Sequence, residues 1–386
     1  MSAHLDEFYA RVAPPTPSLV VDLDVISARY ALLAAELPGG RAWYAVKANP
    51  ARPILERLHA LGACFDIASR HELEACLAVG AQAADCSFGN TAKRPDEVQR
   101  ARAAGVELFV FDAPAELEKL AVHAPGASVF CRLAVDGGGS AWPLGRKFGC
   151  PPSGAVALLR HAQSLGLRPR GISFHIGSQQ QDATAWDRAA GLAAEIIGAG
   201  RRAGLPLDLV NLGGGLPARY TAADDPAAHV QAVGAAIRAH LTDVETLIVE
   251  PGRYLVADAG MLEASVLLVR AEADTGKPWV HLDAGRYSGL TEGDTVAYAV
   301  SAWRDGQPVG GPLQRVVIAG PTCDSDDVFG LEQTYELPVD LRVGDRVRLA
   351  STGAYSTALD LVGYNGIVPP TLHYTGRPSP PHGALD

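Results

Sequence analysis

The stretch Trp43-Tyr44-Ala45-Val46-Lys47-Ala48-Asn49 is an apolar run closed by a lysine, and it begins a series of similar runs. Seven more short, β-type apolar segments follow it, and amphipathic segments rich in Ala, Leu and Arg separate them. This alternation is typical of a parallel sheet with crossover helices. Eight consecutive units in a chain of this length favour a closed (β/α)8 TIM barrel over an open doubly wound sheet.

The expected elements follow directly from these patterns. The expected strands are Ala42–Val46, Cys64–Ala68, Cys86–Phe88, Leu108–Asp112, Val129–Ala134, Gly171–His175, Leu207–Leu212 and Thr246–Glu250. The expected helices are Pro53–Leu61, His71–Val79, Pro95–Ala104, Pro114–Val122, Gly154–Leu165, Ala185–Arg202 and Ala227–Leu241.

After Gly252 the pattern changes to Val-rich alternating segments with turns, which predicts a β domain. Its expected strands are Leu262–Val269, Trp279–Leu282, Gln314–Ile318 and Arg346–Ala350. Pro17–Val21 is also strand-like and precedes a helical stretch, Val25–Glu36. We therefore expect residues 1–21 to add to the β domain, residues 22–255 to form the barrel, residues 256–370 to form a β-sandwich or barrel-like domain, and residues 371–386 to be a flexible tail.

Composition is that of a globular protein that acts on small molecules. The chain has 386 residues, 48% of them hydrophobic, and a net charge of −10 with scattered cations, which argues against nucleic acid as a partner. The N-terminus lacks a basic region followed by an apolar core, and no apolar run reaches membrane-spanning length. Six cysteines show neither CxxC pairing nor metal spacing, so we expect reduced thiols, no metal and a cytoplasmic location.

Polar residues at the ends of the expected strands indicate a cofactor site. Lys47 supplies an amine for an aldehyde, the triglycine Gly213–Gly215 supplies a cradle for a phosphate, and Glu250-Pro-Gly-Arg253 supplies an acid for a ring nitrogen. Barrel enzymes assemble their sites at the carboxyl ends of the strands. The residues at or near those ends are Lys47, Asp66, Arg132, His175, Gly213 and Glu250.

Lys47 and His175 each have an ordinary interpretation as well as a functional one. Lys47 alone fits a solvated lysine, but its apolar approach predicts a desolvated amine with a lowered pKa, suited to a Schiff base. His175 alone fits a satisfied core histidine. Its place three residues before Ser178 instead predicts a ring lying on a flat cofactor, with the serine hydroxyl on a phosphate oxygen.

The remaining motifs also have both an ordinary structural interpretation and a functional one. Gly213–Gly215 could be only a flexible loop, but it follows an apolar strand, so its N–H groups more plausibly face an anion. Glu250 and Arg253 fit a surface ion pair, or a carboxylate that points into the barrel mouth. Cys323 fits a buried thiol, although its polar neighbours favour a proton donor.

Taken together, these motifs resemble the fold-type III decarboxylases that depend on pyridoxal 5′-phosphate (PLP), the family of ornithine, lysine, arginine and diaminopimelate decarboxylases. The resemblance runs from Pro17 to about Gly366. It rests on these motifs in the family's order: Ala-Val-Lys47-Ala-Asn, Asp66-Ile-Ala-Ser, Phe174-His175-Ile-Gly-Ser178, Gly213-Gly-Gly215, Glu250-Pro-Gly-Arg253-Tyr, Gly-Pro-Thr-Cys323-Asp324 and Gly353-Ala-Tyr355. It implies an obligate head-to-tail homodimer in which Cys323 and Asp324 serve the partner's active site.

The resemblance also implies roles for individual residues. Lys47 would bind the PLP aldehyde, His175 would stack on the ring, and Glu250 would keep the ring nitrogen protonated. Cys323 would protonate the α-carbon after carbon dioxide leaves, and Asp324, with Tyr287 nearby, would meet the distal amine of a basic substrate. The implied phosphate cradle is Ser178, Gly213, Gly214, Gly215, Gly252, Arg253 and Tyr355, and the implied partners near the lysine are Asp66 and Arg132.

The substrate stays open between several amino acids. The Cys323-Asp324-Ser-Asp-Asp loop resembles the ornithine and lysine branch, which makes diamines for polyamine synthesis, whereas the diaminopimelate branch has Cys-Glu-Ser-Gly-Asp. Ornithine decarboxylases also carry a second aspartate, and none aligns without a gap between Asp283 and Tyr298. Glu292 or Asp294 are the candidates to replace it. A lost carboxylate would weaken selection for the amine by about 2–5 kcal/mol, so a neutral, non-standard or diaminopimelate-like substrate is an alternative.

Two further alternatives belong to other functional classes. A racemase of the same architecture would need a second base opposite Lys47, and the Cys323 loop argues against it. A binding-only homologue that regulates polyamine synthesis would not need both Lys47 and Cys323, and this chain has both. PLP-dependent decarboxylation of a basic L-amino acid, ornithine or lysine, to a diamine is therefore the favoured interpretation.

Overall fold

The computed structural model describes residues 3–37, 41–271 and 276–378. The chain divides into two compact units. Residues 27–217 and 225–252 form the first, called the barrel unit here. Residues 3–26, 218–224 and 253–378 form the second, called the β unit.

The barrel unit contains the eight-stranded parallel sheet that the sequence predicts, with strand order β11-β10-β8-β6-β5-β4-β3-β2. Backbone hydrogen bonds from Trp43 N–H to Val249 O (2.9 Å) and from Ala45 N–H to Pro251 O (3.1 Å) join its first strand to the segment at the end of its last. The strands are β2 Trp43–Ala45, β3 Cys64–Ile67, β4 Cys86–Phe88, β5 Leu108–Phe111, β6 Ser128–Arg132, β8 Arg168–Ser173, β10 Leu209–Asn211 and β11 Thr246–Ile248.

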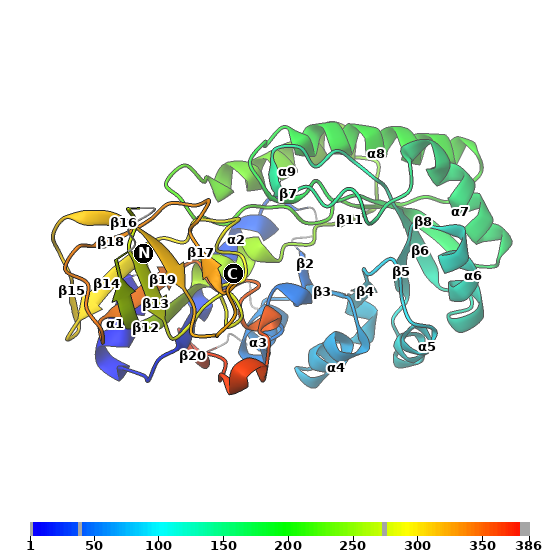
Figure 1. The fold of residues 1–386 in the computed structure, drawn as a ribbon. Coiled ribbons are helices and arrows are strands. Elements are labelled where there is room, and N and C mark those ends of the chain that lie inside the picture. The colour runs from blue at the N-terminus through cyan, green and yellow to red at the C-terminus, as the bar shows by residue number, and fades with distance from the viewer. Residues whose placement is uncertain (1–2, 38–40, 272–275, 379–386) are drawn as a thin grey trace. The chain divides into compact units, whose positions relative to one another are not determined.

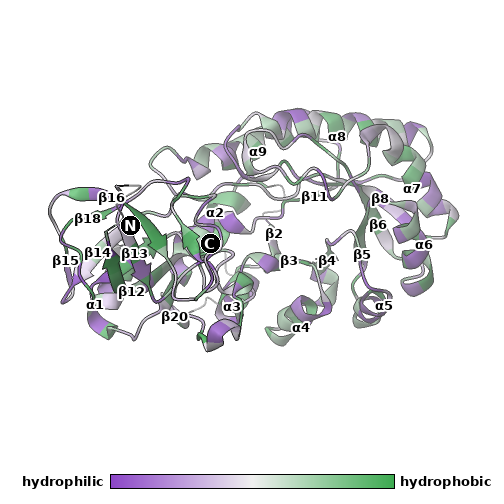
Figure 2. Cartoon of the chain, viewed as in Figure 1, coloured by the Kyte–Doolittle hydropathy of each residue, from purple (hydrophilic) through white to green (hydrophobic). Residues whose placement is uncertain are grey.

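Helices connect these strands and lie outside them (Figure 1). They are α2 Leu23–Ala34, α3 Arg52–Ala60, α4 Arg70–Ala78, α5 Pro95–Ala104, α6 Pro114–His123, α7 Ala155–Ser164, α8 Ala185–Arg202 and α9 Pro226–His240. Hydrophobic and hydrophilic residues alternate along α8, as an amphipathic helix on a sheet requires (Figure 2). Side-chain caps begin two helices, since Ser69 accepts from Glu72 N–H before α4 and Asp225 accepts from Ala227 N–H before α9.

Aromatic side chains on the strands of the barrel unit are buried. Phe65, Phe88, Phe109 and Phe111 are fully shielded from solvent, and Phe130 is 1% exposed. Each such side chain contributes about 1.5–3 kcal/mol relative to an exposed one, which explains why short strands of three to six residues persist.

The β unit is built on a ten-stranded mixed sheet. Its strands are β1 Ser18–Asp22, β12 Gly260–Arg270, β13 Trp279–Leu282, β14 Val300–Arg304, β15 Gln307–Pro308, β16 Leu313–Ala319, β17 Val328–Phe329, β18 Tyr335–Pro338, β19 Arg346–Ala350 and β20 Thr371–Thr375. The N-terminal strand β1 pairs antiparallel with β12 and parallel with β20. A short helix, α10 Arg253–Val256, precedes β12.

Several elements were not predicted from the sequence, among them the helix α1, the strands β14, β15, β17 and β18 of the β unit, and the strands β7 and β9. The helix α1 Ala3–Val12 packs Leu5, Phe8 and Tyr9 against β1 and β12. The Tyr9 hydroxyl donates to the Met261 carbonyl at 2.7 Å, which ties the helix to the sheet. In the barrel unit, β7 Ser140–Trp142 and β9 Ser178–Gln180 form a separate antiparallel pair.

The C-terminal end differs from the expected flexible tail over residues 371–386. Residues 371–375 form β20, because their backbone groups pair with all five residues of β1. The part of the expected tail that covers residues 379–386 lies outside the described residues.

All six cysteines are free thiols, and five of them are buried, whereas Cys323 is exposed. The Sγ atoms of Cys131 and Cys150 lie 3.3 Å apart and are not bonded to each other. Along the part of the chain that the structure describes, no helix is both long and apolar enough to cross a membrane.

We expect Gly171→Ala to destabilise the barrel by at least about 2 kcal/mol, because a Cβ atom there would lie 1.7 Å from the Leu209 carbonyl oxygen of the neighbouring strand. Gly154→Ala is the matched control, since a Cβ at Gly154 meets nothing within 4 Å. Denaturant unfolding measures both free energies. Equal stability of the two variants would contradict the close approach of β8 and β10.

Candidate active site

One cavity in the barrel unit gathers five of the predicted site residues. Lys47, Asp66, Arg132, His175 and Glu250 all line it. They follow or end four different strands and the loop after β11. The rest of the lining is Gly89, Val110, Phe130, Ser173 and Phe174. The strand ends therefore bring together an amine, two carboxylates, a guanidinium and an imidazole.

Lys47 lies in a short 3-10 turn, Val46–Ala48, directly after β2. Its side chain is exposed, so the expectation of a desolvated lysine is wrong for this structure. Val46 before it and Ala48 after it are both buried, so Lys47 is an exposed residue between two buried ones in this turn. Burial raises the pKa of Asp66 and of Glu72, and Lys47 is close enough to oppose both rises.

Asp66 is buried at the end of β3, 4% exposed. The Ser87 hydroxyl donates to its Oδ1 at 3.1 Å. Burial and the charge of Glu250 raise the pKa of Asp66 well above its usual range, and Lys47 opposes this rise. Gly89 is required here, because a Cβ atom at that position would lie 2.0 Å from Asp66 Oδ1.

Asn211, which the sequence analysis missed, holds Glu250 in place. This side chain is fully buried at the end of β10. Its Nδ2 donates to Glu250 Oε1 at 2.5 Å, and its Oδ1 accepts from Gly213 N–H at 2.8 Å. The sequence does contain a sign of this role. Asn211 is a polar residue within the largely apolar stretch Leu207–Leu212, and that stretch ends directly before the triglycine. Asn211 thus links the carboxylate to the glycine loop.

His175 is held as a neutral imidazole. Gly177 N–H donates to its Nδ1 at 3.1 Å, which leaves the proton on Nε2. Burial, together with the charges of Arg132 and Lys47, lowers the pKa of His175 well below its ordinary 6.5. Burial also lowers the pKa of Arg132, whose guanidinium lies 4.9 Å from the centre of the Phe148 ring.

The triglycine loop forms a tight turn beside His175. Gly213 and Gly215 have positive φ angles of 65° and 118°. A Cβ on Gly214 would lie 3.0 Å from His175 Nε2, and one on Gly215 would lie 2.5 Å from the Gly177 carbonyl. Gln180 N–H, in the same strand as Ser178, donates to Gly215 O at 3.0 Å. The backbone therefore approaches closely where a phosphate would need N–H donors and space.

The β unit contains the other two predicted phosphate ligands. Arg253 is 4% exposed, and its guanidinium lies 4.8 Å from the Tyr355 ring centre. Tyr355 has a φ of 53°, a conformation that non-glycine residues rarely adopt. The two terminal nitrogens of Arg253 donate to the two oxygens of Glu292 at 2.6 and 2.7 Å, and Nη1 also donates to the Tyr220 hydroxyl at 2.6 Å.

These contacts correct one expectation about the substrate. Glu292 was a candidate to replace the absent second aspartate, but it is a partner of Arg253. Asp294, the other candidate, accepts from Gly330 N–H at 3.0 Å and lies 3.3 Å from Arg286 Nη1. Both carboxylates therefore already have donors in the fold.

Cys323, Asp324 and Tyr287 come together in loops of the β unit. Cys323 N–H donates to Asn365 Oδ1 at 3.1 Å. The Tyr364 hydroxyl donates to Asp324 Oδ2 at 3.1 Å, and the Tyr287 and Tyr364 rings meet edge to face at 5.5 Å. Hydrogen bonds from Asp326 N–H and from the two tyrosine hydroxyls lower the pKa of Asp324. Asp324 is therefore an ionised acid beside an exposed thiol.

Asp327 fixes the Cys323 loop, and the sequence analysis did not single it out. Its side chain is 3% exposed. It accepts from Arg286 N–H at 2.7 Å and from the Thr322 hydroxyl at 2.7 Å. The Asp327 carboxylate thus joins the loop before Cys323 to the loop that carries Tyr287.

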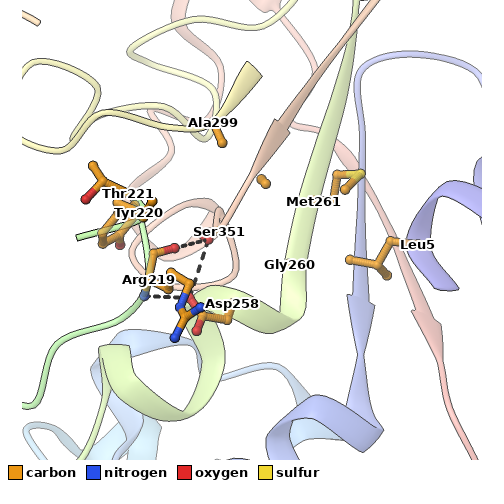
Figure 3. Close-up of a pocket in the computed structure, with 11 residues that line it drawn as sticks. Leu5, Arg219, Tyr220, Thr221, Asp258, Gly260, Met261, Ala299 and Ser351 are labelled. Atoms are coloured by element: carbon orange, nitrogen blue, oxygen red, sulfur yellow. Dashed lines mark hydrogen bonds between the residues drawn. The ribbon is translucent and has the colours of Figure 1, made fainter. Parts of the chain in front are cut away.

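A larger cavity of the β unit, about 410 Å³, contains none of the predicted site residues (Figure 3). Its polar groups bond to one another: Arg219 N–H donates to Asp258 Oδ1 at 2.9 Å, and the Ser351 hydroxyl donates to Arg219 O at 2.7 Å. Leu5, Met261 and Ala299 supply part of its apolar lining.

The donor set of the strand ends fits PLP. An amine, a carboxylate anchored by an amide, a neutral imidazole and a glycine turn with no room for Cβ atoms match an aldehyde, a ring nitrogen, a flat ring and a phosphate. The fold and site therefore define a barrel enzyme of the PLP-dependent class.

Comparisons with known proteins identify the family. The family "Pyridoxal-dependent decarboxylase, pyridoxal binding domain" matches residues 23–257. The lysine/ornithine decarboxylase of Selenomonas ruminantium is 32% identical over 370 residues, covering 94% of this chain and 91% of that protein. The ornithine decarboxylase of Caenorhabditis elegans is 31% identical, covering 92% and 86%. The chain belongs to the PLP-dependent decarboxylases of the ornithine and lysine branch.

Solved structures agree with this assignment and confirm the expected fold class. The lysine/ornithine decarboxylase of Vibrio vulnificus, solved with putrescine, has a TM-score of 0.83 and 30% identity, covering 97% of this chain and 99% of that one. SrLDC, solved with PLP and cadaverine, has a TM-score of 0.85 and 30% identity, covering 96% and 93%. This protein is therefore an amino-acid decarboxylase with PLP as its cofactor.

The neutral state of His175 leads to a prediction about acid stability. Because the pKa of His175 is depressed in the folded protein, the unfolded chain takes up a proton below about pH 6.5 that the folded protein does not, so stability falls as the pH decreases. The cofactor-free His175→Gln variant should therefore lose about 1 kcal/mol less stability than the parent between pH 7.5 and 5.5. Denaturant unfolding at the two pH values tests this, with the exposed His71→Gln as control. An identical loss in parent and His175→Gln would contradict it.

Proposed function

We propose that the chain converts a basic L-amino acid, ornithine or lysine, to the corresponding diamine. The observation that carries this proposal is Asp324, an acid with a lowered pKa beside the exposed Cys323 thiol. An ionised carboxylate is a suitable partner for a distal ammonium. The relatives named as lysine/ornithine decarboxylases, and the solved complexes with putrescine and cadaverine, support the same substrate class.

The barrel residues are proposed to hold the cofactor ring. When bound, PLP supplies an electron sink for the pair released as carbon dioxide leaves. Lys47 would bind its aldehyde, and Glu250, fixed by Asn211, would keep a proton on the ring nitrogen. The neutral His175 ring would lie on the face of the cofactor without adding a charge. Asp66 and Arg132 would set the charge around the Lys47 amine.

The phosphate is proposed to bind where the backbone and the buried arginine offer donors. The barrel unit would contribute Ser178, Gly213, Gly214, Gly215 and Gly252. The β unit would contribute Arg253 and Tyr355, whose ring packs on the guanidinium. Glu292 engages the two terminal nitrogens of Arg253, and this geometry fixes the plane of the guanidinium.

Two residues of the β unit are proposed to act on the substrate. The Cys323 thiol would donate a proton to the α-carbon after carbon dioxide leaves, a role that suits its exposed, polar loop. Tyr287 would border the substrate side chain, since its hydroxyl is already a partner of Asp324.

The active unit is proposed to be a homodimer with shared sites in the cytoplasm. Apolar side chains are exposed along the segment that bonds to Cys323: Leu359, Leu361, Val362 and Val368 are 46–80% exposed. Clustered exposed apolar residues are typical of a protein–protein interface. Free thiols, two of them 3.3 Å apart, favour a reducing compartment.

A substrate panel tests the reaction. Purified, PLP-loaded protein should release carbon dioxide from ornithine or lysine faster than from arginine, diaminopimelate or neutral amino acids. Lys47→Ala should abolish both this turnover and the visible absorbance of the bound cofactor, because it removes the amine that binds the aldehyde. The exposed Lys147→Ala should retain both. A Lys47→Ala variant that still holds the cofactor as a borohydride-reducible imine would refute the role of Lys47.

Subunit complementation tests the shared site. Lys47→Ala and Cys323→Ala homodimers should each be nearly inactive. If one subunit supplies Lys47 and its partner supplies Cys323, each mixed dimer regains one of its two sites. At equal mixing and full exchange about half the dimers are mixed, so activity should recover to roughly a quarter of the parent rate. No recovery despite demonstrated exchange would mean that both residues act within one chain.

A further inference from the structure

Asp360 is a carboxylate with few hydrogen-bond donors near it among the described residues. It lies between β19 and β20, directly after the turn Thr357–Leu359. Both of its oxygens are shielded from solvent and have no hydrogen-bond partner among the residues that the structure describes. Burial raises the pKa of Asp360 to about 6, and the Gly289 N–H opposes this rise only in part. Apart from the nearby Gly289 N–H, the described residues offer this shielded carboxylate no donor that would compensate its burial.

Ser356, four residues earlier, has the same deficit. Its side chain is 1% exposed, and within the described ranges its Oγ has no hydrogen-bond partner. Both residues adjoin Gly289, since a Cβ atom on Gly289 would lie 3.9 Å from Ser356 Cβ. Three oxygens of this segment therefore lack hydrogen-bond partners within the described ranges, and two of them belong to one carboxyl group. A primary ammonium has three N–H donors and a positive charge. It can therefore satisfy the oxygens of Asp360 and Ser356 together.

The same segment contacts the loops that hold the proposed substrate residues. Leu361 N–H, next to Asp360, donates to the Tyr287 carbonyl at 3.0 Å. Further along the segment, Tyr364 donates to Asp324 and Asn365 accepts from Cys323 N–H. Asp360 is thus on the segment that frames the Cys323-Asp324 loop.

Other acids of these loops have donors already. Glu292 pairs with Arg253, Asp294 lies beside Arg286, and Asp327 accepts from the Thr322 hydroxyl. Asp324 accepts from Tyr364, but it is open to solvent. Asp360 differs from them because its oxygens are shielded from solvent and, apart from the nearby Gly289 N–H, have no donor among the described residues.

We propose that Asp360, assisted by Ser356, receives the distal ammonium of the diamino-acid substrate and so determines the preference for basic side chains. This inference rests on the proposed decarboxylation of ornithine or lysine. Asp360 would then be the second carboxylate, besides Asp324, that binds the substrate amine. The sequence analysis looked for this carboxylate between Asp283 and Tyr298, which is a different segment.

The test compares PLP-loaded parent, Asp360→Asn and a matched control, Asp326→Asn, which removes the same charge from an exposed position of the Cys323 loop. The measured quantity is kcat/KM for lysine divided by kcat/KM for norleucine, which has the same chain without the amine; ornithine and norvaline form the second pair. Asp360→Asn should lower these ratios by about 10- to 100-fold, because the ammonium loses its buried counter-charge. Asp326→Asn should change them by less than about threefold.

A readout that does not depend on turnover accompanies the kinetics. Cadaverine and putrescine should raise the melting temperature of the parent and of Asp326→Asn, and raise that of Asp360→Asn much less. Without diamine, Asp360→Asn should melt higher than the parent, because the amide removes an unpaired buried charge. If Asp360→Asn fails to fold, Ser356→Ala should lower the ratio several-fold instead.

The outcomes separate this inference from the proposed function. Unchanged selectivity and unchanged diamine stabilisation in a folded Asp360→Asn protein would overturn the role of Asp360 while leaving the decarboxylase proposal intact. If the parent acts on no diamino acid, the proposed function fails. In that event, calorimetric binding of cadaverine that is lost in Asp360→Asn would still support an ammonium site, and binding that is kept would exclude it.

Discussion

Closure of the barrel by its first and last strands is the constraint on which the cofactor site depends. Trp43 and Ala45 donate their N–H groups to Val249 O and Pro251 O. The acceptors of these two bonds are the residues directly before and after Glu250, and the donors lie shortly before Lys47 in the sequence. An amine and a carboxylate that are far apart in the sequence therefore meet at one end of the barrel, where both line the same cavity. Without this closure the two groups would lie at opposite edges of an open sheet.

Charge at this end of the barrel is controlled by burial as much as by pairing. Burial raises the pKa of Asp66 and lowers those of Arg132 and His175, so each group is driven toward its neutral form. Glu250 accepts a hydrogen bond from the side-chain amide of Asn211. A single anchored carboxylate beside a neutral imidazole is what a protonated ring nitrogen requires. Asn211 connects that carboxylate to the glycine loop, so the proposed ring and phosphate positions would be linked through one buried side chain.

The sequence predicted the eight barrel strands and seven crossover helices well, because both depend on local periodicity. It also placed the main site residues at strand ends, which follows from topology. Asn211 and the Arg253–Glu292 pair were missed or misassigned, since their partners are distant in the sequence and no periodicity marks them. The same reason explains β20: residues 371–375 look like a polar tail until β1 supplies their backbone partners. Exposure of Lys47 depends on a single turn that hydrophobicity alone does not reveal.

The two units divide the chemistry between regular and irregular structure. The barrel unit presents its groups from strand ends, which fixes them relative to one another and suits a cofactor of constant shape. The β unit presents Cys323, Asp324 and Asp360 from loops, and loops tolerate changes that would disrupt a strand. A shielded carboxylate with few donors lowers the stability of the fold in the absence of ligand, and among the described residues the Gly289 N–H offsets this cost for Asp360 only in part. This loss of stability is explained if the substrate ammonium pairs with Asp360. In that case the loops of the β unit, rather than the barrel, select the side chain of the substrate.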